Sequence, residues 1–436
     1  MKYSEETVLL LKRLELTKQW IYLPLNQFIV ANFMNRVLLS VCFLALTIPA
    51  LAQKDVQKKL QTKFIEAENG SVIELEEGTF HFDASLSIDG KKNLTIKGKG
   101  MNKTILSFKG QISGAEGIKV TDGSNIVLQD LTVQDSKGDC IKTQKVDGIV
   151  FRNIKVEWTG GPNKDNGGYG LYPVQCKNVL IEGCEAIAAS DAGIYVGQSQ
   201  NVIVRNCKAH ENVAGIEIEN TLYADVYDNE TVNNVGGVLV FDLPGLMQKK
   251  GGFVRVFNNN IHDNNHVNFA PKGNIVARVP QGTGVMILAT NNVEIFDNKI
   301  INNRTVSTAI SSYYISEIPI KDKEYYPYPT NIYIHDNVFE RKHERTTMKG
   351  RMGKMYRFKL KFGKDVPFIQ YDGIVDAKFK NEDGSLKPEL GICILNNKNQ
   401  SFANIDAENS FKNISRDIKP FEREGIKQKE VVLSIQ

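Results

Sequence analysis

Short segments in which aliphatic and polar residues alternate recur along most of this chain. The first and third positions are mostly aliphatic or Phe, and the fourth is usually polar or charged, so one face of each strand belongs in a core and the other in water. The segments are LTIKG (94–98), IVLQD (126–130), IVFRN (149–153), VLIEG (179–183), VIVRN (202–206), the degenerate ADVYD (224–228), VRVFN (254–258), VEIFD (293–297) and IYIHD (332–336). The shortest intervals between their starts are 22 and 23 residues, which indicates a structural repeat with inserted loops.

A second alternating strand follows within each repeat. These strands are GIKVTD (117–122), CIKTQ (140–144), GLYPVQ (170–175), GIYVG (193–197), GIEIE (215–219), GVLVF (237–241) and GVMIL (284–288). Two or three short strands with their turns fill the shortest repeats and leave no room for a helix. Each coil must then pair with the coils above and below it, so the pattern predicts an all-β fold, a single parallel β-helix with equivalent residues stacked about 4.8 Å apart.

The residue after the first turn of each repeat supports this prediction. Along the coils this position is occupied by Leu131, Ile154, Cys184, Cys207, Asn229, Asn259, Asn298 and Asn337. A column of internal Asn side chains can satisfy its amides by bonding to the copies above and below. Parallel side-chain directions favour two buried thiols over a disulfide for the cysteine pair, although its spacing would permit a bridge.

Both open ends of such a stack need a cover. At the first end, segment 55–67 carries an apolar helical stripe that includes Ile65, which predicts a capping helix. We expect three parts: the cap with the first strands, the coils with their loop insertions, and a C-terminal part with a basic insertion, further coils and a tail. These parts are residues 53–91, 92–340 and 341–436.

The N-terminal residues have the layout of an export signal. Residues 34–52, MNRVLLSVCFLALTIPALA, place Arg36 before an apolar run that ends in small residues. The run is too short to span a membrane, so we predict a signal peptide that is cleaved after Ala52. Residues 1–33 would bury the charged start of this signal, and we interpret them as a mis-annotated extension upstream of a true start at Met34. The mature protein is then expected outside the cytoplasm, either periplasmic or secreted.

Charge and cysteine content exclude two classes of protein. The formal net charge of the chain is +4, which provides no global positive field for nucleic acid. Five cysteines follow the predicted signal, an odd and small number for so long a chain, so they do not form a disulfide framework.

The outward positions of the second strands predict one groove that mixes cations, carboxylates and phenols. Its members are Asp139, Lys142, Tyr169, Tyr172, Asp191, Tyr195, Glu217 and Glu219. An acidic sugar chain needs these groups for charge pairing and ring stacking. Any β-helix also places polar residues outside, and Tyr is a good strand former, so a purely structural role is the competing interpretation. His210 lies in a predicted turn near the rim of the groove and completes the set of candidate substrate-binding residues.

The coil pattern over roughly residues 54 to 340 resembles right-handed parallel β-helix proteins of the pectate-lyase-like superfamily. The runs YGLYPVQ and SDAGIYVGQSQNVIVRN further resemble an uncharacterised family of exported β-helix repeat proteins. That closer resemblance implies a fold and a location, not a reaction.

The chain is also distantly similar to mannuronan C5-epimerases and alginate lyases, whose motif is Tyr-Gly-x-Asp-Pro-His. Tyr169 matches this motif, with the Gly and Pro that follow it, whereas Tyr172 replaces the Asp and Val174 replaces the His. The resemblance implies that Tyr169 is a catalytic base and that Lys142 is the supporting cation, since a nearby ammonium group favours a phenolate. Val174 cannot exchange protons, which disfavours epimerisation and hydrolysis relative to one-sided β-elimination.

Three functions remain open at this point. The first is an exported protein that binds an extracellular or envelope polysaccharide, and we expect this glycan to be acidic. We rank binding without catalysis above catalysis. The second is an active lyase or epimerase-like enzyme on uronate glycans, and the third is a non-catalytic scaffold that docks an envelope protein.

We expect a monomer. No spacing indicates a metal site, and calcium remains a cofactor option that no motif supports.

Two insertions and one apolar group remain to be placed. Residues 311–329 carry five tyrosines, which suit either a protruding stacking surface or a packed loop. Residues 340–365 hold ten Lys and Arg residues, which suit either a solvated excursion or a polyanion contact. The outward apolar residues Leu239, Phe241 and Leu288 require a cover, either the 242–252 loop or a partner.

Overall fold

The computed structural model describes residues 55–346, 348 and 353–435. The chain divides into two compact units, Met1–Val56 and Gln57–Gln436, and the coils belong to the second. The predicted signal peptide and the extension before it lie outside the described residues. Among the described residues, no helix is long and apolar enough to cross a membrane.

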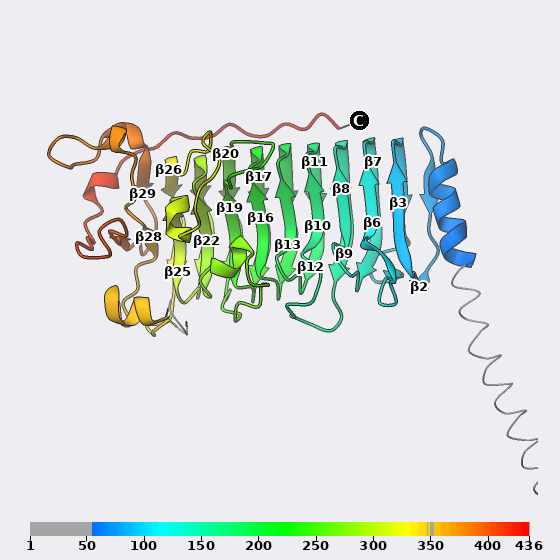
Figure 1. Ribbon diagram of the computed structural model, residues 1–436, viewed down its shortest axis with the longest axis horizontal. Helices are drawn as coiled ribbons and strands as arrows, with labels where there is room; N and C mark the ends of the chain where they lie inside the picture. The colour runs from blue at the N-terminus through cyan, green and yellow to red at the C-terminus, as the bar shows by residue number, and fades with distance from the viewer. Residues whose placement is uncertain (1–54, 347, 349–352, 436) are drawn as a thin grey trace, which may run out of the picture. The chain divides into compact units, whose positions relative to one another are not determined.

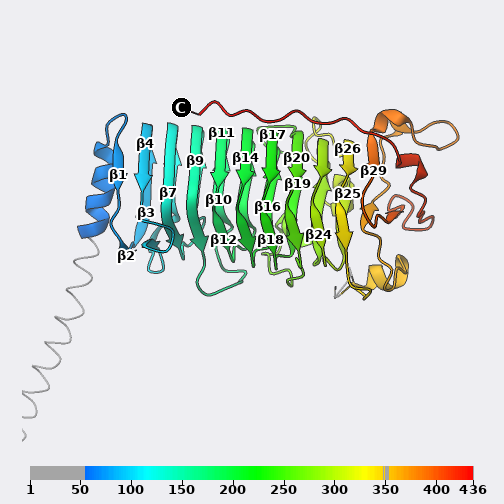
Figure 2. The same cartoon turned by 180° about the vertical axis from the view of Figure 1, so that it is seen from behind.

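Parallel strands stacked coil upon coil build the second unit (Figures 1 and 2). The described strands form a 19-stranded and an 11-stranded sheet, which confirms the predicted parallel β-helix. The 11-stranded sheet contains β3 (Ala84–Asp89), β6 (Ser113–Thr121), β8 (Ile141–Gln144), β10 (Tyr169–Val174), β13 (Ala192–Gly197), β16 (Ala214–Glu219), β19 (Gly236–Phe241), β22 (Thr283–Leu288), β25 (Val306–Ser311), β28 (Ile369–Tyr371) and β30 (Phe402–Asn404).

The 19-stranded sheet consists of two rows of strands on each coil. The first row is β1 (Val72–Glu74), β4 (Lys92–Lys97), β7 (Ser124–Gln134), β9 (Asp147–Glu157), β11 (Lys177–Glu182), β14 (Gln200–Arg205), β17 (Leu222–Tyr227), β20 (Gly252–Phe257), β23 (Asn291–Phe296), β26 (Thr330–His335) and β29 (Ile392–Leu395). The second row is β2 (Gly78–His81), β5 (Thr104–Ser107), β12 (Glu185–Ile187), β15 (Lys208–His210), β18 (Glu230–Val232), β21 (Asn260–His262), β24 (Lys299–Ile301) and β27 (Val338–Glu340), and the long strands β7 and β9 run through both rows.

Short helical turns occur only in insertions among the described coils. They are the 3₁₀ helices η1 (Ile275–Arg278), η2 (Tyr313–Ser316), η4 (Ala377–Phe379), η5 (Pro388–Leu390) and η6 (Lys419–Phe421), and the π-helix η3 (Met355–Lys359).

The predicted asparagine column is confirmed. The Asn298 side chain accepts from Asn259 Nδ2 at 2.9 Å and donates to Asn337 Oδ1 at 2.9 Å, and the ladder continues to Asn397. A second ladder at the next corner, which the sequence analysis missed, follows the same rule. It consists of Asn212, Asn234, Asn264 and Asn303.

The described cysteines are all free and buried, which confirms the thiol interpretation. In the Cys184–Cys207 pair, the Cys184 backbone N–H donates to Cys207 Sγ at 3.4 Å. The two thiols occupy the column that asparagines fill in later coils, and each Sγ lies within hydrogen-bond distance of backbone carbonyls.

An N-terminal helix over residues 55–66 covers the first coil. Leu60 and Phe64 are buried against the core, as predicted. Ile65 was predicted to point inward as well, but it is 64% exposed. A 3.6-residue turn places it about 100° from Phe64, which takes it off the buried stripe.

The C-terminal tail lies along the first-row strands (Figures 1 and 2). The backbone N–H groups of Gln428, Val431 and Ser434 donate to Glu294, Asp225 and Asn178, at 2.7, 3.1 and 3.2 Å. These acceptors lie on β23, β17 and β11, two coils apart each time. Three extended residues advance about 10 Å and two coils rise about 9.6 Å, so the tail meets a new acceptor at every third residue.

Candidate functional site

The predicted groove residues gather on the outward face of the 11-stranded sheet. Tyr172 of β10 pairs with Lys142 of β8, and Tyr195 of β13 pairs with Glu217 of β16. β10 and β13 are also in register, so these four residues form one row across four coils. Tyr195 belongs to a hydrophobic cluster separate from the core inside the coils, which confirms that this row points outward.

Three tyrosine rings form the centre of the site. The ring of Tyr169 lies 4.5 Å from that of Tyr172 and 4.4 Å from that of Tyr195, centroid to centroid. The rings of Tyr172 and Tyr195 are 5.0 Å apart and nearly perpendicular. Tilted and edge-to-face contacts at these distances are favourable, so the three rings support one another.

The site is covered, whereas the sequence predicted an exposed groove. Tyr195 is 4%, Glu217 1% and Glu219 6% exposed. Insertions between β19 and β20, β21 and β22, and β25 and β26 pack their apolar residues onto this face. The covering residues are Leu243, Phe269, Ala270, Ile275, Val276, Val279, Tyr313, Ile315, Ile318, Ile320 and Tyr325. The same insertions cover the apolar residues Leu239, Phe241 and Leu288, so the cover comes from this chain and extends beyond the 242–252 loop.

Two covered carboxyl groups have pKa values near neutrality. Burial and, next, the charge of Glu219 raise the pKa of Asp191 to about 7, although hydrogen bonds from Asn274 and Tyr169 oppose the rise. The Asn274 amide donates to Asp191 Oδ2 at 2.9 Å. Burial likewise raises the pKa of Glu219 to about 7, although the Tyr195 hydroxyl donates to its Oε1 at 2.7 Å. Both groups can therefore accept or release a proton near neutral pH.

Glu217 is the third covered carboxyl group, and it lies on β16 with Glu219. Burial and the charges of Asp191 and Glu219 raise its pKa well above the usual range. Its Oε2 is buried and has no hydrogen-bond partner among the described residues. An ionised carboxylate without a partner is very costly to bury, so these surroundings favour the neutral acid, and a ligand reaches the unpaired oxygen only if the cover moves.

The β8 side of the site is more open. Asp139 accepts from the Tyr169 backbone N–H at 3.2 Å, and burial raises its pKa to about 6. Lys142 Nζ lies 4.8 Å from the centre of the Tyr172 ring and 4.0 Å from Glu116. The only cation of the predicted groove therefore stands at one edge, beside water.

This arrangement does not fit the implied role of Tyr169 as a base assisted by Lys142. Lys142 stacks on the ring of Tyr172, which lies three residues after Tyr169 in the chain. Burial and the carboxylates of Asp191, Glu217 and Glu219 raise the pKa of Tyr169 well above its usual value. A phenol in such surroundings keeps its proton, so Tyr169 is a hydrogen-bond donor here.

His210 lies apart from the cluster. It was predicted in a turn at the rim of the groove, but it belongs to β15 of the 19-stranded sheet and pairs with Ile187 and Val232. Its Nε2 lies 3.1 Å from Glu185 Oε1 on the neighbouring coil. The short run after Cys207 forms a second-row strand, and this strand turns His210 away from the tyrosines.

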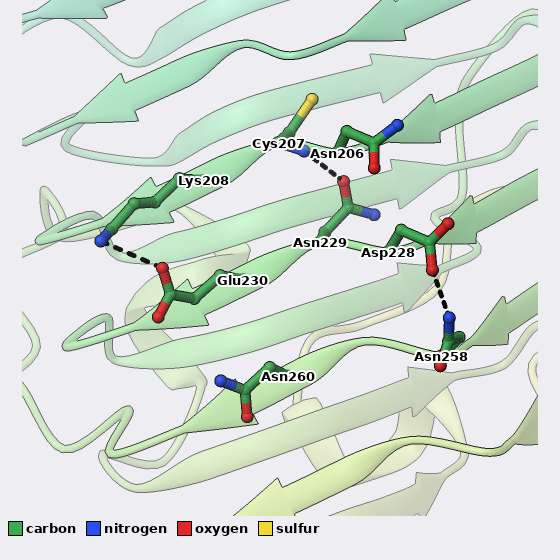
Figure 3. Close-up of a pocket in the computed structure, with 8 residues that line it drawn as sticks. All are labelled: Asn206, Cys207, Lys208, Asp228, Asn229, Glu230, Asn258 and Asn260. Carbon is green, nitrogen blue, oxygen red and sulfur yellow. Dashed lines mark hydrogen bonds and ion pairs between the residues drawn. The ribbon is translucent and has the colours of Figure 1, made fainter.

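A shallow depression on the 19-stranded sheet is a separate feature (Figure 3). Its lining residues are Asn206, Cys207, Lys208, Asp228, Asn229, Glu230, Asn258 and Asn260. Lys208 pairs with Glu230 at 3.0 Å, and Asn229 accepts from the Cys207 N–H at 3.0 Å. The repeat thus satisfies several of these groups itself. Burial opposes the shift, but hydrogen bonds from Lys208 and His262 lower the pKa of Glu230, in contrast to the covered cluster.

The structure adds residues that the sequence analysis missed. Asn274 comes from the insertion between β21 and β22, 83 residues from Asp191. Asp242, at the end of β19, accepts from the Gly251 N–H at 2.7 Å, and burial raises its pKa to about 8. Asp242 directly follows the outward Phe241, so strict alternation would have placed it inward, and nothing local indicates Asn274.

No group of three or more His, Cys, Asp or Glu side chains in the described ranges is arranged to hold a metal ion. His262 and His266 are four residues apart in the chain, but they have different partners. His262 contacts Glu230 and Asp263, and His266 packs edge-on against Phe269.

Comparison with known proteins agrees with this architecture. A family model described as a right handed beta helix region matches residues 99–243, in agreement with the predicted handedness. A search of curated protein sequences found no match. Similar solved structures include DFA-IIIase from Arthrobacter chlorophenolicus A6 in complex with DFA-III, at 12% identity and a TM-score of 0.50 over 87% of this chain and 86% of that one.

Two further structures share the fold at low identity. The A-module of the Azotobacter vinelandii mannuronan C-5 epimerase AlgE4 is 15% identical, with a TM-score of 0.49 over 81% of this chain and 91% of that one. An alginate lyase from Paenibacillus sp. str. FPU-7 is 13% identical, with a TM-score of 0.44 over 66% and 97%. The family model and the likeness to DFA-IIIase show the fold alone, a right-handed parallel β-helix, and not a reaction.

Proposed function

We propose that this protein binds a polysaccharide at the cluster of three tyrosines and covered carboxyl groups. The observation that carries the proposal is the unpaired oxygen of Glu217, which lies beneath the covering insertions in the row that also holds Tyr172 and Tyr195, so a glycan must displace part of the cover to reach it. Tyrosine rings can cover the apolar faces of sugar rings, and neutral carboxyl groups can both donate to and accept from sugar hydroxyls. Stacked rings beside convergent polar groups are the usual composition of a small-molecule or glycan site.

The charge state of the covered carboxyl groups sets the pH at which an acidic glycan is expected to bind. A uronate next to ionised Asp191, Glu217 and Glu219 would be repelled, whereas protonated carboxyl groups would donate hydrogen bonds to it. Lys142 offers a cation at the open edge. An acidic glycan is therefore the expected ligand under mildly acidic conditions, and a neutral glycan is expected to bind with a weaker dependence on pH.

Binding is expected to depend on Glu217 and on pH. Retardation of the protein by immobilised alginate, pectate and a neutral glycan is measured at about pH 6 and about pH 8, on either side of the pKa of about 7 of Asp191 and Glu219. Acidic glycans should bind about tenfold more tightly at the lower pH. Glu217→Ala should lower the affinity about tenfold, roughly what one lost hydrogen bond to a charged group costs.

Lys208→Ala, which removes a side chain that lines the depression of Figure 3, is the matched control and should bind as the unaltered protein does. Equal effects of the two substitutions, or binding that is insensitive to Glu217, would place the glycan elsewhere. A protein captured in a pull-down without any glycan retardation would favour the scaffold function.

Cleavage of the bound glycan is a second candidate. It is favoured by two carboxyl groups, Asp191 and Glu219, whose pKa values of about 7 suit proton transfer and whose hydrogen-bond partners differ. These two groups can protonate a leaving oxygen and activate water, so hydrolysis is the reaction to test beside β-elimination by Tyr169. New reducing ends without absorbance from unsaturated uronates would support hydrolysis, and Glu219→Gln should abolish them.

We also propose that the protein is exported, on the pattern of residues 34–52. N-terminal sequencing of the mature protein should give a start at Gln53. A start at Met1 or Met34 in the purified extracellular fraction would contradict cleavage after Ala52.

A further inference from the structure

Three partly exposed tyrosines form a second aromatic surface. Tyr314 follows β25 and is 46% exposed, and Tyr326 and Tyr328 precede β26 and are half-buried. The ring of Tyr328 lies 5.5 Å from the ring of Tyr314 and 5.5 Å from that of Tyr326. The rings are tilted by 57° and 60°, so together they make a curved surface, which we call the tyrosine platform.

Polar groups from another insertion border the tyrosine platform. The Tyr326 hydroxyl donates to Asp376 Oδ2 at 3.0 Å. Lys378 Nζ lies 4.5 Å from the centre of the Tyr326 ring and 3.3 Å from Asp376 Oδ2. Lys378 is exposed, so its ammonium group can also meet a ligand. An aromatic surface with a charged, hydrogen-bonding edge results.

Buried neighbours hold the tyrosine platform in place. Tyr313 and Tyr325 point inward, are 5% and 7% exposed, and contact one another at 5.3 Å between ring centres. The Tyr325 hydroxyl donates to the Asp242 carbonyl at 2.6 Å. In the chain each inward tyrosine directly precedes an outward one, so the packing that covers the sheet also fixes the platform, and little side-chain entropy remains to be lost on binding.

We propose that the tyrosine platform of Tyr314, Tyr326 and Tyr328 is a second contact surface for the same polysaccharide chain, remote from the covered carboxyl cluster. A sugar ring offers an apolar C–H face and a rim of hydroxyls, which match the rings and the Asp376–Lys378 edge. The choice of a glycan over a protein rests on the function proposed above and on a shared face, since Tyr313 and Tyr325 pack in the same cluster as Tyr195.

The distance between the two surfaces sets the length of glycan that can use both. β25 lies three coils beyond β16, in the order β16, β19, β22 and β25. At about 4.8 Å per coil this is roughly 15 Å, a span of several sugar units. Short oligosaccharides reach one surface only, whereas a polymer reaches both and gains affinity from the second contact.

The test compares a polymer with a trisaccharide prepared from it. Tyr314→Ala should weaken polymer binding about three- to tenfold, the range that one aromatic stacking contact accounts for, and should leave trisaccharide binding at the carboxyl cluster unchanged. Tyr314→Phe should keep most of the polymer affinity. Tyr223 is the matched control, because it is 45% exposed and stacks on Phe253 at the edge of the 19-stranded sheet. Tyr223→Ala should bind both ligands normally.

The outcomes separate this inference from the proposed function. Polymer affinity that is unchanged in Tyr314→Ala, or lowered equally in Tyr223→Ala, overturns the platform. Polymer binding that depends on Tyr314 but not on Glu217 supports the platform and overturns the carboxyl cluster as the glycan site. A variant that loses a protein partner while glycan binding is intact overturns the assignment of a glycan ligand, and absence of any glycan retardation overturns both proposals.

Discussion

Raising the pH from about 5 to about 8 is expected to destabilise the folded protein, because buried carboxyl groups hold protons that the unfolded chain releases. Asp191 titrates near 3.8 when unfolded and at about 7 when folded, and Glu219 near 4.5 and at about 7. Stability from such groups is fully present below the unfolded pKa and is lost as pH rises through the folded pKa. Asp191 and Glu219 alone should contribute a slope of about −2 to −3 kcal/mol per pH unit near pH 6. Glu217 and Asp242, whose pKa values are also raised, should add to it.

Urea unfolding at a series of pH values measures this slope. Glu219→Gln keeps the shape of the side chain and its acceptor for the Tyr195 hydroxyl, but removes the titration, so the slope should become smaller by about 1 kcal/mol per pH unit. Glu230→Gln is the control: burial opposes the shift, but hydrogen bonds from Lys208 and His262 lower the pKa of Glu230, so this group is ionised in both states above about pH 5 and its substitution should leave the slope unchanged. A stability that rises between pH 5 and pH 8 would show that the cluster is not protonated in the folded protein.

Asn298→Ala is expected to cost about 3 kcal/mol or more of unfolding free energy. The Asn298 amide donates to the carbonyls of Val256 and Phe296 and to Asn337 Oδ1, and its oxygen accepts from Asn259. The substitution leaves buried groups without partners on three coils. Each such group costs about 1–3 kcal/mol, and a small cavity adds to the loss.

Asn260→Ala provides the control for that measurement. Asn260 is the residue after Asn259 in the ladder, lies on β21 and is exposed. Its substitution should change the unfolding free energy by less than about 0.5 kcal/mol. Similar losses for both variants in thermal or urea unfolding would mean that the asparagine ladder does not stabilise the coils.

The repeat could be predicted from the sequence because it is set by local alternation. Ile194 and Val285, for example, lie inward where the period-two pattern places them. The asparagine column followed from one position in each coil, and Tyr172 and Tyr195 came together because register places equivalent residues side by side. The second ladder keeps the same spacing as the first, because each of its asparagines lies five residues after a member of the first column, so the signal was present in the sequence but was missed.

The sequence by itself determined the coils, the inward and outward faces, and which residues share the row of Lys142, Tyr172, Tyr195 and Glu217. Only the tertiary structure decided that this row is covered, because the contacts of the covering insertions are non-local and have no period. Asn274 reaches Asp191 across 83 residues, and the tail reaches Asn178 across 256. Burial under these insertions raises the pKa of the carboxyl groups, and a strand pattern indicates which way a side chain points but not what lies on top of it.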